Sequence, residues 1–159
     1  MAYSSAGITE VSENIWGKNL PYIKSVDSKV DEKAPNFIYK TSIPNGQIVD
    51  TLSKKYTDLD KNNIISSFDI TKRSEADYVL EVTVCDKKIS GRDIRMMFGL
   101  RSTNFTIEKT KDSINFTTKG YGHGAGMSQY GANFMAQDGN SYEKILIHYY
   151  DGIILQKVY

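Results

Sequence analysis

The chain has 159 residues, of which 40% are hydrophobic and 25% are charged, and its formal net charge is +1. These values are typical of one globular domain that buries a core without metal or disulfide support. The balanced charge argues against a nucleic-acid partner, and no window reaches the roughly 18 apolar residues of a membrane span. The single cysteine, Cys85, cannot form an intramolecular disulfide and is expected in the core.

The first half of the chain predicts few regular elements. A short helical turn is expected from a cap at Ser12 to Gly17. Residues 27–34 are charged and poor in apolar side chains, which is typical of a loop. Alternation over 37–42 predicts a strand, and helical spacing of apolar residues predicts a helix over 46–56.

The second half is richer in strand signals. Strands are expected over 64–71 and 78–85, then a short helical segment over 92–98 and a β-hairpin whose arms are 105–108 and 114–117. Two helices capped by Ser128 and Ser141 should end at Gly139 and Gly152, and 153–158 should form a closing strand. Because strands and helices alternate irregularly along the chain, the sequence predicts a single α+β domain over 1–159, with a small mixed sheet and several short helices.

The stretch GYGHGAGMSQYGA, residues 120–132, is the first candidate for a site. It holds five glycines, two tyrosines, a serine, a glutamine and one of the two histidines of the chain. It lies between a predicted strand and a predicted helix N-terminus, which would offer free backbone N–H groups and a positive dipole end to a ligand. Such dense glycine indicates sharp turns or a close approach of the backbone.

Three other interpretations of this stretch are weaker or plainer. A phosphate loop requires lysine after its last glycine, but Met127 follows Gly126. A nucleophile elbow requires a second glycine where Tyr130 stands, so a serine hydrolase using Ser128 with His123 or His148 is a weak second option. In the third, the glycines form only a tight turn and Ser128 only caps the helix.

The residues closely resemble the stage II sporulation protein D family, sporulation lytic transglycosylases that share a domain with amidase enhancers. The resemblance rests on the signature over 120–132 and on matching positions over 90–105 and 135–150. Thr9, the pair Trp16-Gly17 and the pair Pro21-Tyr22 also fit the pattern. It therefore covers nearly the whole chain.

The resemblance implies cleavage of peptidoglycan glycan strands between N-acetylmuramic acid and N-acetylglucosamine, with 1,6-anhydro ends, during engulfment in sporulation. Family members carry the presumed catalytic glutamate on a helix resembling EALKAQAVAART, and no such segment occurs between Met1 and Tyr159. We therefore expect the chain to be a piece of a longer protein. By itself it should contain no catalytic residue and show little or no glycan cleavage. Its exposed face should be buried against another copy or a crystal neighbour.

Substrate binding is assigned to seven residues: Tyr121, His123, Ser128, Gln129, Tyr130, Arg101 and Ser102. Each has a plainer role as well. Tyr121 is equally expected to stack on a sugar or to cover a sheet edge. His123 would otherwise be a structural histidine, and Ser128 is expected to be a cap more than a catalyst. Of Gln129 and Tyr130, one should face the groove and the other the core. His148 is expected to be a satisfied buried histidine, and Trp16 a core residue.

The expected partners are peptidoglycan glycan strands and a cell-wall amidase. No cofactor and no metal are expected, because Cys85 and two separated histidines fall short of a zinc ligand set. The resemblance implies an extracytoplasmic, envelope-associated protein whose anchor lies outside this chain. The alternative to an enzyme is a peptidoglycan-binding or amidase-activating module of the same fold.

Overall fold

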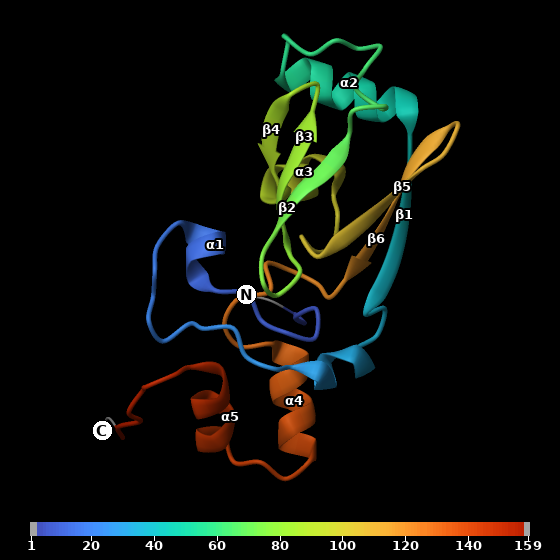
Figure 1. Ribbon diagram of the computed structural model, residues 1–159. Helices are drawn as coiled ribbons and strands as arrows, with labels where there is room; N and C mark the ends of the chain where they lie inside the picture. The colour runs from blue at the N-terminus through green and yellow to red at the C-terminus, as the bar shows by residue number, and fades with distance from the viewer. Residues whose placement is uncertain (1–2, 158–159) are drawn as a thin grey trace. The chain divides into compact units, whose positions relative to one another are not determined.

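The structure, a computed structural model, describes residues 3–157 and has an α+β fold, as the sequence predicts (Figure 1). It contains five α-helices and two three-stranded antiparallel sheets in the described residues. The chain divides into two compact units. The first consists of residues up to 37 and from 120 onward, and the second of 38–119, so in sequence the second is inserted into the first.

The inserted unit, residues 38–119, holds both sheets and two helices. Its elements in chain order are β1 (Ile38–Pro44), α2 (Asn45–Lys55), β2 (Asp69–Arg73), β3 (Val79–Val84), β4 (Lys87–Ser90), α3 (Gly91–Phe98), β5 (Phe105–Lys109) and β6 (Ser113–Lys119). One sheet has the order β1-β6-β5, with Ile38 opposite Lys119 and Phe105 opposite Thr118. The other has the order β2-β3-β4.

A tight two-residue turn joins β3 to β4. Cys85 and Asp86 both have positive φ, 47° and 63°, as a type I′ hairpin turn requires. Cys85 therefore lies in the turn and is only partly buried, so the prediction of a fully buried strand cysteine is wrong.

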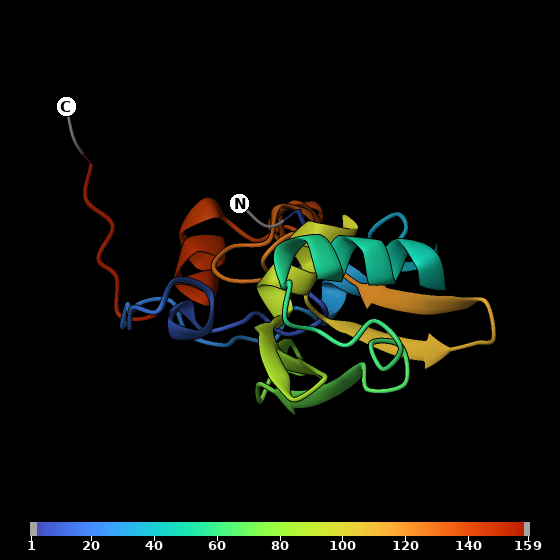
Figure 2. The ribbon, with the colours of Figure 1, turned by 90° about the horizontal axis from the view of Figure 1, so that it is seen from above.

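The inserted unit is built around an apolar core. Helix α2 packs against β1 and β6, and α3 against β3 and β4 (Figures 1 and 2). The rings of Phe68, Phe98 and Phe105 surround Phe116 at centroid distances of 6.1, 5.9 and 5.8 Å. Ile94 and Phe98 of α3 are buried in this core. Hydrophobic burial therefore accounts for the stability of this unit.

The other unit is poor in regular structure. Its elements are α1 (Ser12–Trp16), a 3₁₀-helix η1 (Lys29–Lys33), α4 (Gln129–Gln137) and α5 (Tyr142–Tyr149). Ser128 and Ser141 accept hydrogen bonds from the N–H groups of Gly131 and Lys144, so both predicted caps are confirmed. Its buried residues are largely polar, among them Ser5, Ser28 and Asp31.

Four local predictions are wrong. Residues 61–67 form turns, so the strand begins only at Asp69. Residues 29–33 form a 3₁₀-helix where a loop was expected. Val11, not Ser12, is the N-cap of α1, and Ser12 Oγ accepts from the Leu20 N–H at 2.8 Å. No strand forms over 153–157, and Val158 lies outside the described residues.

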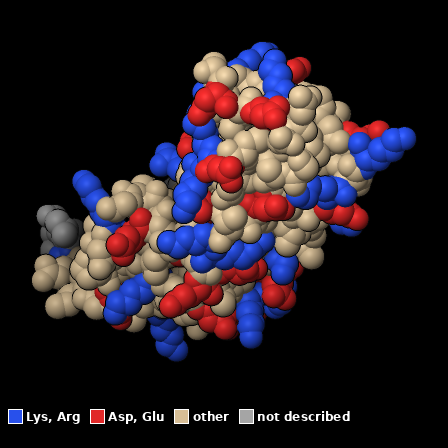
Figure 3. Space-filling model, turned by 45° about the horizontal axis from the view of Figure 1, so that its top comes forward, with Lys and Arg blue, Asp and Glu red and all other residues tan. Residues whose placement is uncertain are grey.

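Basic and acidic side chains are intermixed on the face that Figure 3 shows, in keeping with the net charge of +1. Within residues 3–157, none of the helices has the length and apolar character needed to cross a membrane.

The close packing of Gly131 in α4 gives a first prediction. A Cβ atom at this position would lie 1.9 Å from Tyr149 Oη and 2.9 Å from Ser28 Oγ. Gly131→Ala should therefore lower the free energy of unfolding by about 1–3 kcal/mol, although alanine favours helices.

Gly46→Ala is the matched control, because Gly46 lies in α2 and its Cβ would meet nothing within 4 Å. That variant should gain up to about 1 kcal/mol. Urea unfolding measures both, and equal stability changes in the two variants would contradict the packing at Gly131.

Candidate functional site

The glycine-rich loop over 120–126 has a regular backbone pattern. Its four glycines, Gly120, Gly122, Gly124 and Gly126, have φ angles of 75°, 111°, 77° and 72°. Every second residue therefore adopts a conformation that strains any other amino acid. This alternation explains why the loop carries so many glycines.

The N-terminal segment fixes the loop through backbone pairing. Tyr3 N–H donates to Tyr121 O at 2.9 Å, and Tyr121 N–H donates to Ser4 O at 3.0 Å. Further along, Glu10 N–H donates to Gly124 O at 2.9 Å. The loop is therefore tied at two points to residues more than a hundred positions earlier in the chain.

A buried carboxylate, Asp31, holds the far end of the loop. Its side chain is fully buried, and Oδ2 accepts hydrogen bonds from the Ser5 N–H at 2.7 Å and from Ser28 Oγ at 3.1 Å. Its Oδ1 accepts from Ser128 Oγ at 2.7 Å. Both carboxylate oxygens thus have donors, as burial of such a group requires.

Ser128 is an interior residue. Its Oγ donates to Asp31 and accepts from the Gly131 N–H at 3.0 Å, and its exposure is 0%. The hydroxyl therefore serves the cap and the Asp31 network. The assignment of Ser128 to substrate binding remains a prediction.

Tyr149 extends the same network from α5. Its hydroxyl lies 2.8 Å from Ser28 Oγ, and only 1% of the residue is exposed. Burial, together with the nearby charge of Asp31, raises the pKa of Tyr149 to about 12, against a smaller lowering by the Ser28 hydrogen bond.

His123 is half-buried, and the hydrogen bond at one ring nitrogen fixes its tautomer. Nδ1 accepts from the Ala125 N–H at 3.1 Å, so in the neutral ring the proton resides on Nε2. The ring meets Trp16 edge-to-face, with centroids 5.3 Å apart. Trp16 is 45% exposed, so its predicted place in the core is wrong.

Two tyrosines of the loop region differ in exposure. Tyr121 is 44% exposed and stacks on Tyr3 with centroids 4.9 Å apart. Tyr130 is half-buried and packs near Phe134, whereas Gln129 is exposed. The structure thus brings Tyr121, His123 and Gln129 to the surface of one unit.

Arg101 and Ser102 belong to the other unit. The Arg101 guanidinium lies over the Tyr39 ring at 4.0 Å, a cation–π contact. Ser102 is buried, and its Oγ accepts from the Asn104 N–H at 3.0 Å. Their assignment to substrate binding remains a prediction.

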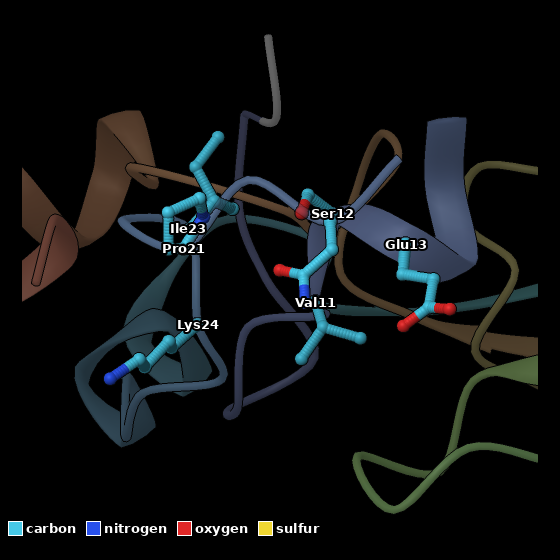
Figure 4. A pocket seen from close by; sticks show the side chains of 7 residues that line it. Val11, Ser12, Glu13, Pro21, Ile23 and Lys24 are labelled. Atoms are coloured by element: carbon cyan, nitrogen blue, oxygen red, sulfur yellow. The ribbon is translucent and has the colours of Figure 1, made fainter. Parts of the chain in front are cut away.

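A pocket of about 300 Å³ lies beside α1 (Figure 4). It is lined by Val11, Ser12, Glu13, Asn19, Pro21, Ile23 and Lys24. Lys24 pairs with Asp151 and lowers the pKa of that carboxyl. None of the sequence-predicted site residues lines this pocket.

Sequence reasoning missed two buried acids, Asp31 and Glu10. For Asp31 a signal existed, because Ser28 stands three residues before it in the spacing of a capping box. Glu10 carried no local signal. His148 is half-buried, with Nε2 2.8 Å from Asp27 O, so it is satisfied but less buried than predicted.

The described part of the chain holds no group of three His, Cys, Asp or Glu side chains able to bind a metal. Metal independence remains a prediction.

Removing the charge of Asp31 tests the network. Asp31→Asn replaces one acceptor oxygen by an N–H₂ group that faces existing donors, so we expect a loss of about 1–3 kcal/mol in unfolding free energy. Glu32→Gln, the same change at the exposed neighbour, should have almost no effect. Chemical denaturation compares the two, and similar midpoints would argue against the network.

The raised pKa of Tyr149 gives a pH prediction. The unfolded chain loses the phenol proton near pH 10, whereas the folded chain keeps it to about 12. The folded state then binds more protons, so stability should fall between pH 10 and 12 by on the order of 3 kcal/mol from this group. Tyr149→Phe should remove that part of the alkaline loss. Parallel urea titrations at pH 9 and 11.5 measure it, and identical losses would contradict the prediction.

Three proteins are among the relatives that comparison with known proteins gives. Stage II sporulation protein D of Bacillus amyloliquefaciens is 40% identical over 152 residues, which is 94% of this chain and 42% of that protein. The protein of the same name from Bacillus subtilis is 38% identical over 149 residues, with the same two shares. An amidase enhancer of Bacillus subtilis is 29% identical, over 97% of this chain and 29% of that protein.

This chain spans less than half the length of the two stage II sporulation proteins D. A family model described as a domain of unknown function, DUF8618, matches residues 18–126, which is more than half of the chain. The resemblance to stage II sporulation protein D that the motifs indicated is confirmed, and the chain belongs to the DUF8618 family.

Proposed function

We propose that the chain is the glycan-binding part of a sporulation-related cell-wall protein that cleaves peptidoglycan strands as a lytic transglycosylase. The names of the relatives support the sporulation role. The observation that carries the glycan role is the set of side chains at the glycine-rich loop. Trp16 is exposed and contacts the His123 ring, and Tyr121 of the same loop is exposed as well. Such aromatic faces suit sugar rings when polar groups orient them.

The proposed chemistry needs few protein groups. A general acid protonates the glycosidic oxygen, and the same group as a base takes the proton of the 6-hydroxyl, which attacks C1 and closes the 1,6-anhydro ring. We propose a glutamate outside these 159 residues for this role. The residues of this chain would hold the sugars, and His123 would donate Nε2–H to a sugar oxygen.

An amidase-activating module is the second candidate. The similarity to an amidase enhancer over 97% of the chain favours it. In that case the same surface would bind glycan or an amidase without cleaving anything.

The test uses the full-length protein that contains this chain. His123→Ala should lower the rate of 1,6-anhydro product formation about tenfold or more, because a hydrogen bond to the substrate is lost, while the melting temperature changes little. Mass spectrometry of digested glycan strands stripped of stem peptides measures the product. His148→Ala, at the other histidine, whose ring contacts Asp27 O, is the control and should keep full activity.

A large drop in melting temperature with unchanged activity per folded molecule would place His123 in the scaffold. If the wild-type protein forms no anhydro product but raises the rate of a cell-wall amidase, the amidase-activating role holds instead.

A further inference from the structure

Glu10 is a buried carboxylate whose two oxygens differ in their partners. Oε1 accepts from the Val11 N–H at 2.8 Å and from Asn14 Nδ2 at 3.0 Å. Oε2 has no hydrogen-bond partner among the described residues, and the residue is only 1% exposed. Within residues 3–157 it is the one carboxylate oxygen among the buried side-chain atoms without a partner.

This oxygen is costly to the folded chain. Burying a charged acceptor without a donor costs more than burying a neutral one, and native structures seldom keep such a group without a use. Asp31, the other buried acid of this unit, has donors on both of its oxygens. Both oxygens of Asp31 have donors and one oxygen of Glu10 has none, and this difference points to a ligand at Glu10.

The surroundings of Glu10 belong to the candidate site. Its backbone pairs with the glycine-rich loop, where Glu10 N–H donates to Gly124 O, next to His123. Its carboxylate accepts a hydrogen bond from Asn14, an exposed residue of α1. Trp16, on the same short helix, contacts the His123 ring. A ligand held by Trp16 and His123 therefore lies against the segment that carries Glu10.

The hydrogen-bonding groups of Glu10 and His123 match an amide. A carboxylate only accepts hydrogen bonds, and the tautomer of His123 makes Nε2 a donor. An acetamido group offers an N–H to the first and a C=O to the second, while its methyl group and sugar ring suit Trp16. We infer that Glu10 is a ligand-binding residue and that its Oε2 accepts the amide N–H of an N-acetylated sugar. This inference rests on the proposed glycan-binding function.

The test measures by calorimetry how the tetramer of N-acetylglucosamine binds to this chain. The second ligand is cellotetraose, which carries hydroxyl groups in place of the acetamido groups.

Glu10→Gln keeps an oxygen for Val11 and Asn14 but places a donor where Oε2 was. We expect its affinity for the acetylated tetramer to fall about tenfold or more. Affinity for cellotetraose should change little, and the melting temperature should stay equal or rise because an unpaired charge is gone. Glu13→Gln, the same change at an exposed glutamate of α1 (Figure 4), is the control and should bind as the wild type does.

The outcomes separate this inference from the proposed function. Failure of the wild-type chain to bind the acetylated tetramer would overturn both. Normal wild-type binding with equal affinity of Glu10→Gln would overturn the inference alone, as would an equal loss for both sugars. If Glu10→Gln fails to fold, Glu10→Asp, which keeps the charge but withdraws the carboxylate by one methylene, replaces it. The inference then requires that variant to lose affinity for the acetylated tetramer and to keep its affinity for cellotetraose.

Discussion

The carboxylate of Asp31 is the interaction on which the unit around the glycine-rich loop depends. It receives hydrogen bonds from Ser5, Ser28 and Ser128, and Ser28 passes the connection on to Tyr149. One buried carboxylate thus joins the N-terminal segment, the 3₁₀-helix η1, the start of α4 and the end of α5. Because a buried carboxylate is tolerated only with well-placed donors, the network fixes where each segment lies.

The two units reach stability by different means. The apolar core cluster of buried residues lies entirely within 38–119, where Phe116 and its neighbours pack tightly. The other unit buries mainly serines and acids. Hydrophobic burial is not directional, whereas hydrogen bonds are, so the polar unit is better suited to hold side chains in fixed positions. That is the unit in which Tyr121, His123 and Trp16 lie.

Contacts at both ends of the glycine-rich loop fix its position. At one end Gly120 approaches the carbonyl of Ser5 so closely that a Cβ would lie 2.4 Å from the oxygen. At the other end Ser128 is bound by Asp31. Between them the backbone N–H of Ala125 orients the His123 ring. Backbone groups therefore determine which atom of the imidazole is a donor.

Elements with strong local signals could be predicted from the sequence. The caps at Ser128 and Ser141 and the hairpin of β5 and β6 depend on residues a few positions apart, and all three form. The dense glycines of 120–126 likewise indicated unusual backbone, which the positive φ angles confirm. In these places the amino-acid sequence by itself determined the structure, because the deciding interactions are local.

Tertiary structure decided the rest. Residues 27–34 have the composition of a loop, yet Asp31 is fully buried because its donors include Ser128, which is 97 positions away. Trp16 is exposed and contacts the His123 ring, although its apolar ring alone favours a core position. Glu10 becomes a candidate only once burial leaves one of its oxygens without a donor. Burial and pairing depend on which distant segments meet, and local sequence patterns do not encode that.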